Sequence, residues 1–242
     1  MFKRVSIAVG LAALLGFGSV AVMAGTPFGG DDTGTIPSDA PKGPVTKCEG
    51  GIAKGLGKLT AGIVKCHISR VTGKLADETA EDACEDAAQL KFTSKAKLTG
   101  CPPCINVNTL AAAVEGLVDS NNNLAYCGST GTTPWGGEDS GNLPTDPKGD
   151  LAKCENGIGK GLGKLVGSII KCHIGRATGK TTDDTGEDAC EDAAQLKFTS
   201  KAKTTGCEAC TNPTTIANTL EGLVDLANNF AYCGSPSGAF LN

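Results

Sequence analysis

The chain is a tandem duplication in which each copy carries its own six cysteines. Cys48 lies 106 residues before Cys154, and at this spacing every cysteine of the first half has a counterpart in the second. A stretch of 17 residues that begins at Glu81 recurs unchanged from Glu187. Such self-similarity predicts two copies of one small fold. The twelve cysteines are Cys48, Cys66, Cys84, Cys101, Cys104, Cys127, Cys154, Cys172, Cys190, Cys207, Cys210 and Cys233.

The abundance of cysteine predicts a disulfide framework. The chain has twelve cysteines but only two methionines and one tryptophan. In exported proteins, disulfides take over the stabilising role that large apolar side chains would otherwise fill. We therefore expect the cysteines to form disulfides.

The N-terminus has the pattern of a secretory signal peptide. Lys3 and Arg4 precede an apolar run from Val5 to Val22, and the small residue Ala24 follows. This pattern predicts cleavage after Ala24 and a secreted or periplasmic mature protein, with an uncleaved membrane anchor as the alternative. Cys48 lies too far downstream to carry a lipid anchor. We expect no membrane span after removal of residues 1–24.

The charge balance argues against one class of partner. The formal net charge of the chain is −4. Nucleic-acid-binding domains usually carry a strongly basic surface, so we expect no nucleic-acid partner.

The domain boundaries follow from composition. Residues 25–46 and 129–150 are rich in glycine, proline, threonine and acidic residues, which predicts two flexible linkers. Residues 47–128 form the first predicted module and residues 151–235 the second. No segment alternates convincingly between apolar and polar residues, so we expect no sheet.

Each module is predicted to be an all-α fold of three helices. Gly73 can end the first helix, and the second is predicted to open with a capping box at Thr79 and Asp82. In the second copy, Asn212 and Pro213 suit the start of the third helix. The apolar face of the first helix is marked by residues at steps of four and three, namely Cys48, Ile52, Leu56, Leu59, Ile63 and Cys66.

Antiparallel packing of these helices brings some cysteines level with one another. Cys66 lies level with Cys84, and Cys48 lies level with the pair Cys101 and Cys104, so these are the predicted bridges. The remaining cysteines leave an odd number at each end of the bundle. Three solutions stay open: a bent third helix, bridges between the modules, or free thiols.

Three features of this framework have alternative interpretations. The motif Cys101-Pro-Pro-Cys104, with its counterpart Cys207 to Cys210, has the spacing of thiol oxidoreductases, but the thioredoxin-like context is missing and a structural role is expected. Gly51 and Gly55, repeated one helical turn apart as Gly157 and Gly161, predict close packing or a dimer face. The lysines of the first helix, Lys47, Lys54, Lys58 and Lys65, predict a solvated face or a surface for an acidic partner.

The two histidines of the chain each follow a cysteine, in Cys66-His67 and Cys172-His173. The favoured interpretation is a histidine on the helix surface beside a disulfide. The alternative is a zinc or copper site of three cysteines and one histidine. Its ligands would be His67 with Cys66, Cys84 and Cys127, and His173 with Cys172, Cys190 and Cys233.

The motifs Lys47-Cys48, Lys65-Cys66-His67, Asp82-Ala-Cys84 and Glu115-Gly-Leu-Val-Asp119 resemble those of exported bacterial cysteine-rich helical repeat proteins. The resemblance implies a fold and a location, but no activity. We see no catalytic triad, phosphate loop or buried carboxylate pair in the sequence. The prediction is therefore a non-enzymatic structural or interaction protein with an extracellular or periplasmic partner. Metal binding is the second hypothesis and thiol redox chemistry the third.

Overall fold

The computed structural model describes residues 25–233, so the predicted signal peptide lies outside the described residues. The first repeat consists of helices α1 (Pro44–Val71), α2 (Glu78–Lys95) and α3 (Val107–Ser120), followed by the 3-10 turn η1 (Asn122–Leu124). The second repeat consists of α4 (Asp150–Ala177), α5 (Asp184–Thr199), α6 (Pro213–Leu226) and η2 (Asn228–Phe230). Within this range, no helix combines the length and apolar character needed to cross a membrane.

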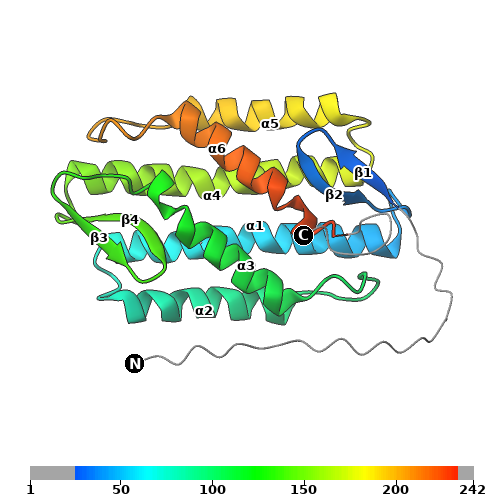
Figure 1. Ribbon diagram of the computed structural model, residues 1–242, viewed down its shortest axis with the longest axis horizontal. Helices are drawn as coiled ribbons and strands as arrows, with labels where there is room; N and C mark the ends of the chain where they lie inside the picture. The colour runs from blue at the N-terminus through cyan, green and yellow to red at the C-terminus, as the bar shows by residue number, and fades with distance from the viewer. Residues whose placement is uncertain (1–24, 234–242) are drawn as a thin grey trace, which may run out of the picture.

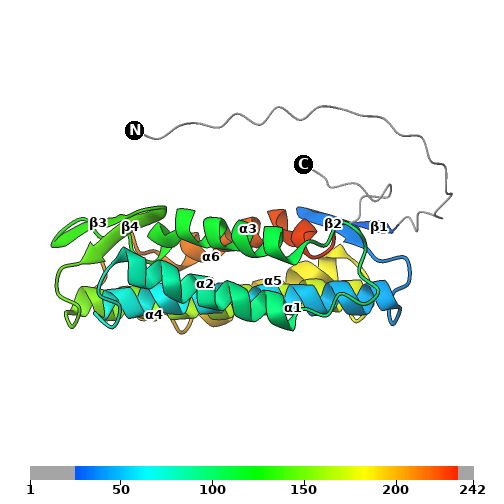
Figure 2. The same cartoon turned by 90° about the horizontal axis from the view of Figure 1, so that it is seen from below.

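The helices form two layers. Helices α5, α4, α1 and α2 lie side by side in the first layer, and α3 and α6 cross one face of it diagonally (Figure 1). Seen from the side, that same face also carries the two β-hairpins, one at each end (Figure 2). The core lies between the layers and is built from the apolar stripes of α1 and α4.

Helices α1 and α4 pack against each other in antiparallel orientation. A Cβ atom added to Gly50, near the start of α1, would contact Ile174 near the end of α4. A Cβ atom on Gly57 would lie 3.1 Å from Ile170, and one on Gly163 would lie 3.6 Å from Ala61. Small residues therefore bring the two longest helices close together, and the N-terminus of each lies beside the C-terminus of the other.

The expectation that the chain has no sheet is wrong. The segments predicted to be linkers contain two antiparallel hairpins, β1 (Thr26–Gly29) with β2 (Asp32–Ile36) and β3 (Thr132–Gly136) with β4 (Asp139–Pro144). Gly30 and Gly137 both have a φ of 57° at the turns, a conformation that glycine adopts at little cost. A two-stranded hairpin is marginal alone, and each is held by one buried aromatic side chain, Phe28 or Trp135.

Each hairpin packs on the repeat that does not follow it in sequence. Hairpin β1–β2 precedes α1 but contacts α6 and η2, where Thr35 N–H donates to the carbonyl of Tyr232 at 3.0 Å. Hairpin β3–β4 precedes α4 but contacts α3 and η1, where Asn142 N–H donates to the carbonyl of Tyr126 at 2.9 Å. The antiparallel packing of α1 and α4 explains this exchange, because the start of α1 lies at the far end of α4.

Helix termini follow the predictions in part. Asn212 caps α6 by accepting hydrogen bonds from Thr214 and Thr215, and Gly73 follows α1 with a φ of 70°. The predicted capping box at Thr79 is wrong, since Asp77 caps α2 instead by accepting from Ala80 N–H at 3.0 Å. Asp77, in extended conformation, caps the first free amides of α2 two residues before the predicted cap Thr79.

All twelve cysteines are paired, which indicates an oxidising compartment outside the cytoplasm. Of the three solutions left open for the remaining cysteines, the structure has bridges between the repeats. Each Cys-x-x-Cys motif is split, because its first cysteine bonds within the repeat and its second bonds to the other repeat. The bridges within repeats are Cys48–Cys101, Cys66–Cys84, Cys154–Cys207 and Cys172–Cys190, and those between repeats are Cys104–Cys233 and Cys127–Cys210.

Gly55 and Gly161 serve internal packing. A Cβ atom on Gly55 would lie 2.7 Å from the ring of Phe92, and one on Gly161 would lie 2.7 Å from the ring of Phe198. These aromatic rings cover the helix backbone directly, which requires the absence of a side chain beneath them.

Candidate metal centres

The two histidines are buried inside the protein, so the prediction of a surface histidine is wrong. Both His67 and His173 are 1% exposed. Residues on three other elements surround each of them. The first cluster consists of His67 on α1, Glu81 and Glu85 on α2, Asp119 on α3 and Asp139 on β4. The second cluster consists of His173 on α4, Glu187 and Glu191 on α5, Asp225 on α6 and Asp32 on β2.

In the first cluster, one imidazole nitrogen faces three carboxylates. The Nε2 atom of His67 lies 2.9 Å from Glu85 Oε1 and 3.1 Å from Asp139 Oδ1. It also lies 3.4 Å from Asp119 Oδ1. Asp139 comes from the exchanged hairpin β3–β4, so the cluster is complete only when that hairpin is docked.

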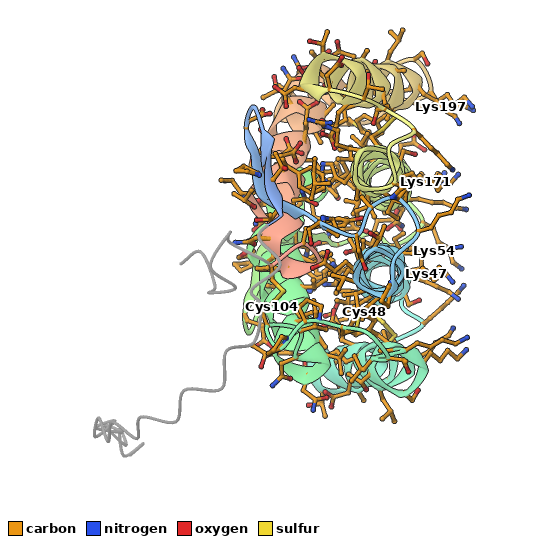
Figure 3. The ribbon with its side chains drawn as sticks, turned by 90° about the vertical axis from the view of Figure 1, so that its right-hand side faces the viewer. Lys47, Cys48, Lys54, Cys104, Lys171 and Lys197 are labelled. Carbon is orange, nitrogen blue, oxygen red and sulfur yellow. A yellow bond between two sulfur atoms is a disulfide. The ribbon has the colours of Figure 1, made fainter. Side chains whose placement is uncertain are left out.

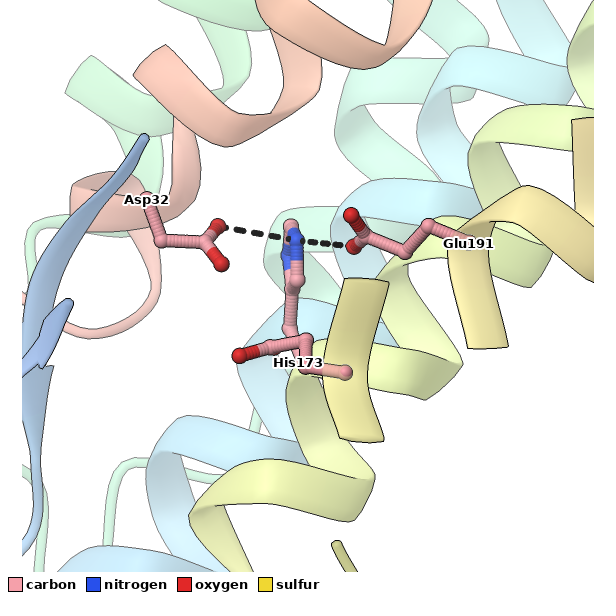
Figure 4. Close-up of side chains that lie close together, drawn as sticks. Asp32, His173 and Glu191 are labelled. Carbon is pink, nitrogen blue, oxygen red and sulfur yellow. Dashed lines mark ion pairs between the residues drawn. The ribbon is translucent and has the colours of Figure 1, made fainter. Parts of the chain in front are cut away.

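The second cluster repeats this geometry. The Nε2 atom of His173 lies 2.8 Å from Glu191 Oε1 and 3.0 Å from Asp32 Oδ1. Its distance to Asp225 Oδ1 is 3.3 Å. Figure 4 shows Asp32 and Glu191 reaching the imidazole from opposite sides, one from the hairpin and one from α5.

Several of these polar atoms lack a hydrogen-bond partner. A single imidazole nitrogen can donate at most one hydrogen, and none of its three contacts has hydrogen-bond geometry in either cluster. Buried polar atoms without partners are costly and rare, so a group of them around one histidine favours a bound cation. The unpartnered atoms around His67 are its own Nε2, Glu81 Oε1, Glu85 Oε1, both carboxylate oxygens of Asp119 and Asp139 Oδ1.

The distances from Nε2 to the carboxylate oxygens match those between two ligands of one metal ion. Ligands about 2.1 Å from a metal lie about 3.4 Å apart in tetrahedral geometry and about 3.0 Å apart in octahedral geometry. The nitrogen-to-oxygen distances of 2.8 to 3.4 Å in the two clusters fall in this range. The donor set of one imidazole and several carboxylates is typical of zinc, manganese and related divalent ions.

A second glutamate lies at the edge of each cluster, next to an arginine. Glu81 Oε2 lies 3.7 Å from Arg70 Nε, and Glu187 Oε2 lies 3.7 Å from Arg176 Nε. Glu81 also accepts a hydrogen bond from the indole N–H of Trp135 at 2.9 Å. The equivalent residue beside Glu187 is Phe28, which has no N–H to donate.

Burial shifts the protonation of the glutamates. It raises the pKa of Glu85 to about 7 in the first cluster and that of Glu191 to about 7 in the second, although contact with the histidine opposes the shift. The pKa of Glu187 rises further, to about 8, because of burial and the nearby charge of Asp32. A bound cation would replace the protons that these side chains otherwise hold near neutral pH.

The carboxylates raise the pKa of each histidine and so favour its charged form. Burial lowers the pKa of His173, but its contacts with Asp225, Asp32 and Glu191 outweigh burial and raise that pKa to about 12. The pKa of His67 is likewise raised well above its usual value by its carboxylates, against the effect of burial. In metal-free protein, the positive imidazolium thus partly balances the surrounding negative charge.

The sequence identified the histidines but not their neighbours. The predicted thiolate ligands Cys66, Cys84 and Cys127, and their counterparts Cys172, Cys190 and Cys233, are all in disulfides and offer no thiolate. The expectation that there is no buried carboxylate pair is also wrong, since Glu81 and Glu85 are 0% and 2% exposed. Their spacing of one helical turn within the unchanged 17-residue stretch was a signal that they share a helix face.

The comparisons with known proteins found no family model, curated protein or solved structure that matches this chain.

Proposed function

We propose that this protein binds two divalent transition-metal ions, one in each cluster. The observation that carries the proposal is that one buried imidazole nitrogen lies within 3.4 Å of three carboxylates from three other elements, in both halves. The cysteine ligands of the metal site considered from the sequence are absent, and carboxylate oxygens take their place. Zinc remains the first candidate ion, while copper is less well matched because Cu(II) prefers a square-planar set richer in nitrogen.

The role of the ions is structural in this proposal, and the protein is not an enzyme. Catalytic metal sites keep a position open for water or substrate, whereas structural sites are closed by protein ligands. The ligating residues His67, Glu85 and Asp119 are each no more than 2% exposed, so solvent barely reaches them. Since Asp139 and Asp32 come from exchanged hairpins, each ion would fasten one hairpin to the repeat on which it packs.

The test is metal analysis of the mature chain purified from an oxidising compartment. We expect about two equivalents of bound metal per chain after dialysis against zinc, and one equivalent in His67→Ala or His173→Ala. The matched pair Glu85→Gln and Asp86→Asn separates ligand loss from general charge loss, because Asp86 neighbours Glu85 on α2 but is exposed. Asp86→Asn should bind as the wild type does.

Two outcomes would contradict the proposal. The first is the absence of zinc, manganese, cobalt or copper binding by calorimetry in chelator-treated, folded protein. The second is unchanged stoichiometry in the double variant His67→Ala/His173→Ala.

A second candidate function, as an interaction protein, is favoured by a basic face. The layer of four helices turns this face away from the hairpins, and Figure 3 shows Lys54, Lys171 and Lys197 pointing outward on it. None of its lysines forms an ion pair with the described residues. Ten exposed lysines at equivalent places in the two repeats are Lys54, Lys58, Lys65, Lys91, Lys95, Lys160, Lys164, Lys171, Lys197 and Lys201.

Five of these lysines line a groove of about 590 Å³ between α4 and α5, which no acidic side chain lines. A recessed groove along a helix pair admits a linear anionic chain, so the proposed partner is an acidic polysaccharide. Reversing the charge of Lys164, Lys171 and Lys197 to glutamate should abolish retention on a dextran sulfate column, whereas Lys180→Glu, outside the groove, should have little effect. Binding to anionic vesicles but not to the polymer would contradict this choice of partner.

A further inference from the structure

The two clusters differ at one position of the exchanged hairpins, and this difference bears on which metal each would hold. Trp135 on β3 and Phe28 on β1 occupy equivalent places, each packed near its histidine with ring centroids 5.5 and 6.2 Å apart. The indole N–H of Trp135 donates to Glu81 Oε2 at 2.9 Å. The ring of Phe28 offers nothing equivalent to Glu187.

The hydrogen bond changes how many oxygens each glutamate has available. Glu81 has one buried oxygen without a hydrogen-bond partner, Oε1, because Oε2 is held by Trp135. Glu187 has two such oxygens, Oε1 and Oε2, of which Oε2 lies 3.7 Å from Arg176 Nε. Both glutamates are 0% exposed, so water does not compensate for the difference.

The two clusters also differ in how many ligand atoms lie close together. In the second cluster, Glu187 and Glu191 converge together with His173 and Asp32, since one ligand atom from each lies within 4.8 Å of the others. Among the described residues of the first cluster, the same criterion gives two separate sets of three. These sets are His67 with Glu81 and Asp139, and His67 with Glu85 and Asp119.

We infer that the second cluster gathers one more carboxylate at a single point than the first and is therefore the more manganese-selective of the two, with Trp135 and Phe28 as the specificity-determining pair. In the first cluster, His67 belongs to two separate sets with two carboxylates each, and Trp135 holds Glu81 by its hydrogen bond. In the second, His173 meets the three carboxylates of Asp32, Glu187 and Glu191 in one set, and Phe28 leaves Glu187 free of such a bond. Manganese favours six oxygen-rich ligands, whereas zinc accepts four or five. This inference rests on the proposed function.

The experiment isolates each cluster in the full chain. His173→Ala leaves the first cluster, and His67→Ala leaves the second. Dissociation constants for Zn²⁺ and Mn²⁺ are measured for each by competition with a chromophoric chelator. We expect the ratio of manganese to zinc affinity to be about tenfold higher in the second cluster, the scale at which partners of metal ligands alter affinity.

Reciprocal substitutions then test the assigned pair. Trp135→Phe in the His173→Ala background should raise the ratio of manganese to zinc affinity in the first cluster toward that of the second. Phe28→Trp in the His67→Ala background should lower the ratio, while Phe28→Leu, which also lacks an N–H donor, should leave it unchanged. If Phe28→Trp fails to fold by circular dichroism, Trp135→Phe decides the question, since it only removes atoms.

Equal ratios in the two clusters, or a ratio that Trp135→Phe does not change, would overturn the inference while leaving metal binding itself intact. Failure of both ions to bind either cluster would instead overturn the proposed function, and the inference with it.

Discussion

The two repeats hold their clusters in nearly the same geometry but surround them differently. The histidine Nε2 lies 2.9 Å from Glu85 in the first cluster and 2.8 Å from Glu191 in the second. Its distance to the hairpin aspartate is 3.1 Å in the first cluster and 3.0 Å in the second. Beside them, however, a tryptophan in one hairpin replaces a phenylalanine in the other. The comparison indicates that duplication kept the inner donors in place, while the residues around them were free to diverge.

The junctions between repeats diverge as well. Glu208 accepts hydrogen bonds from the backbone N–H groups of Ser129 and Thr130, at 2.9 and 2.8 Å. The equivalent position in the first repeat is Pro102, which has no carboxylate. Cys127–Cys210 and Cys104–Cys233 are nevertheless both present, so the covalent connection does not depend on this polar contact.

The strongest test of the comparison removes one hairpin only. A chain beginning at Ser38 keeps the cap that Asp39 provides to α1 but lacks Phe28 and Asp32. We expect bound metal to fall from two equivalents to one, with the loss confined to the cluster of His173. Loss at the cluster of His67 would show that each hairpin serves its own repeat.

The point variant Asp32→Asn should also lower metal binding at the cluster of His173, because it removes one proposed ligand without removing the hairpin. Asp31→Asn is the matched control, since Asp31 is its exposed neighbour. Equal effects of the two substitutions would argue against a role for Asp32 as a ligand.

Disulfides within and between repeats should differ in their contribution to stability. The bridge Cys104–Cys233 closes a sequence separation of 129 residues, whereas Cys66–Cys84 closes 18. In the chain-entropy model, replacing these pairs by alanine costs up to about 5 and about 3 kcal/mol, respectively. Urea unfolding of the two double variants measures the difference, and a larger loss for Cys66–Cys84 would contradict it.

The pH dependence of stability should reverse when metal is bound. In metal-free protein, Glu85, Glu191 and Glu187 have folded pKa values of about 7, 7 and 8, above the ordinary 4.5. The folded state therefore binds more protons than the unfolded state, and stability falls as pH rises from about 5 to about 8. The raised pKa values of the histidines act in the same direction above pH 6.5.

In zinc-loaded protein, the ligands are deprotonated, so stability should rise over the same interval as protons cease to compete. Thermal unfolding midpoints at pH 5.5 and 8, with chelator and with zinc, provide the comparison. Parallel trends in the two samples would argue against metal ligation by these groups.

The smallest expected effects concern two glycines of α1 and their counterparts. A Cβ atom on Gly51 would meet no atom within 4 Å, so Gly51→Ala should stabilise the protein by about 0.5 to 1 kcal/mol through helix propensity. Gly55→Ala should destabilise it, because the new methyl group would lie 2.7 Å from Phe92. Gly157→Ala and Gly161→Ala should reproduce this contrast, and chemical unfolding of the four variants tests it.

Much of the local structure could be predicted from the sequence. Apolar residues at steps of three and four determine the helices, and positions equidistant from a turn bring Cys66 near Cys84. Both are properties of a helix and its neighbour along the chain. The helix caps and the glycines that end helices are local features as well, although the predicted cap of α2 lies two residues after the observed one.

The hairpins and the clusters depended on contacts between distant segments. The hairpin segments read as linkers because two short strands have little stability of their own. Their burial of Phe28 and Trp135 and their hydrogen bonds to the helical repeats hold them. The carboxylates around His67 could not be found from spacing, because Asp119 and Asp139 reach it from α3 and β4, which only the folded core brings near. The histidines themselves stood out in the sequence, but as neighbours of cysteine rather than of carboxylates.

The duplication, the helical segments and the even number of cysteines follow from the sequence alone, because each of these is a local or compositional property of the chain. The exchange of hairpins, the bridges between repeats and the burial of each histidine among carboxylates arise only in the folded protein. They result from the antiparallel packing of α1 against α4. This packing places the start of each repeat at the end of the other, so the hairpin carboxylate of each cluster comes from a segment that the sequence assigns to its neighbour.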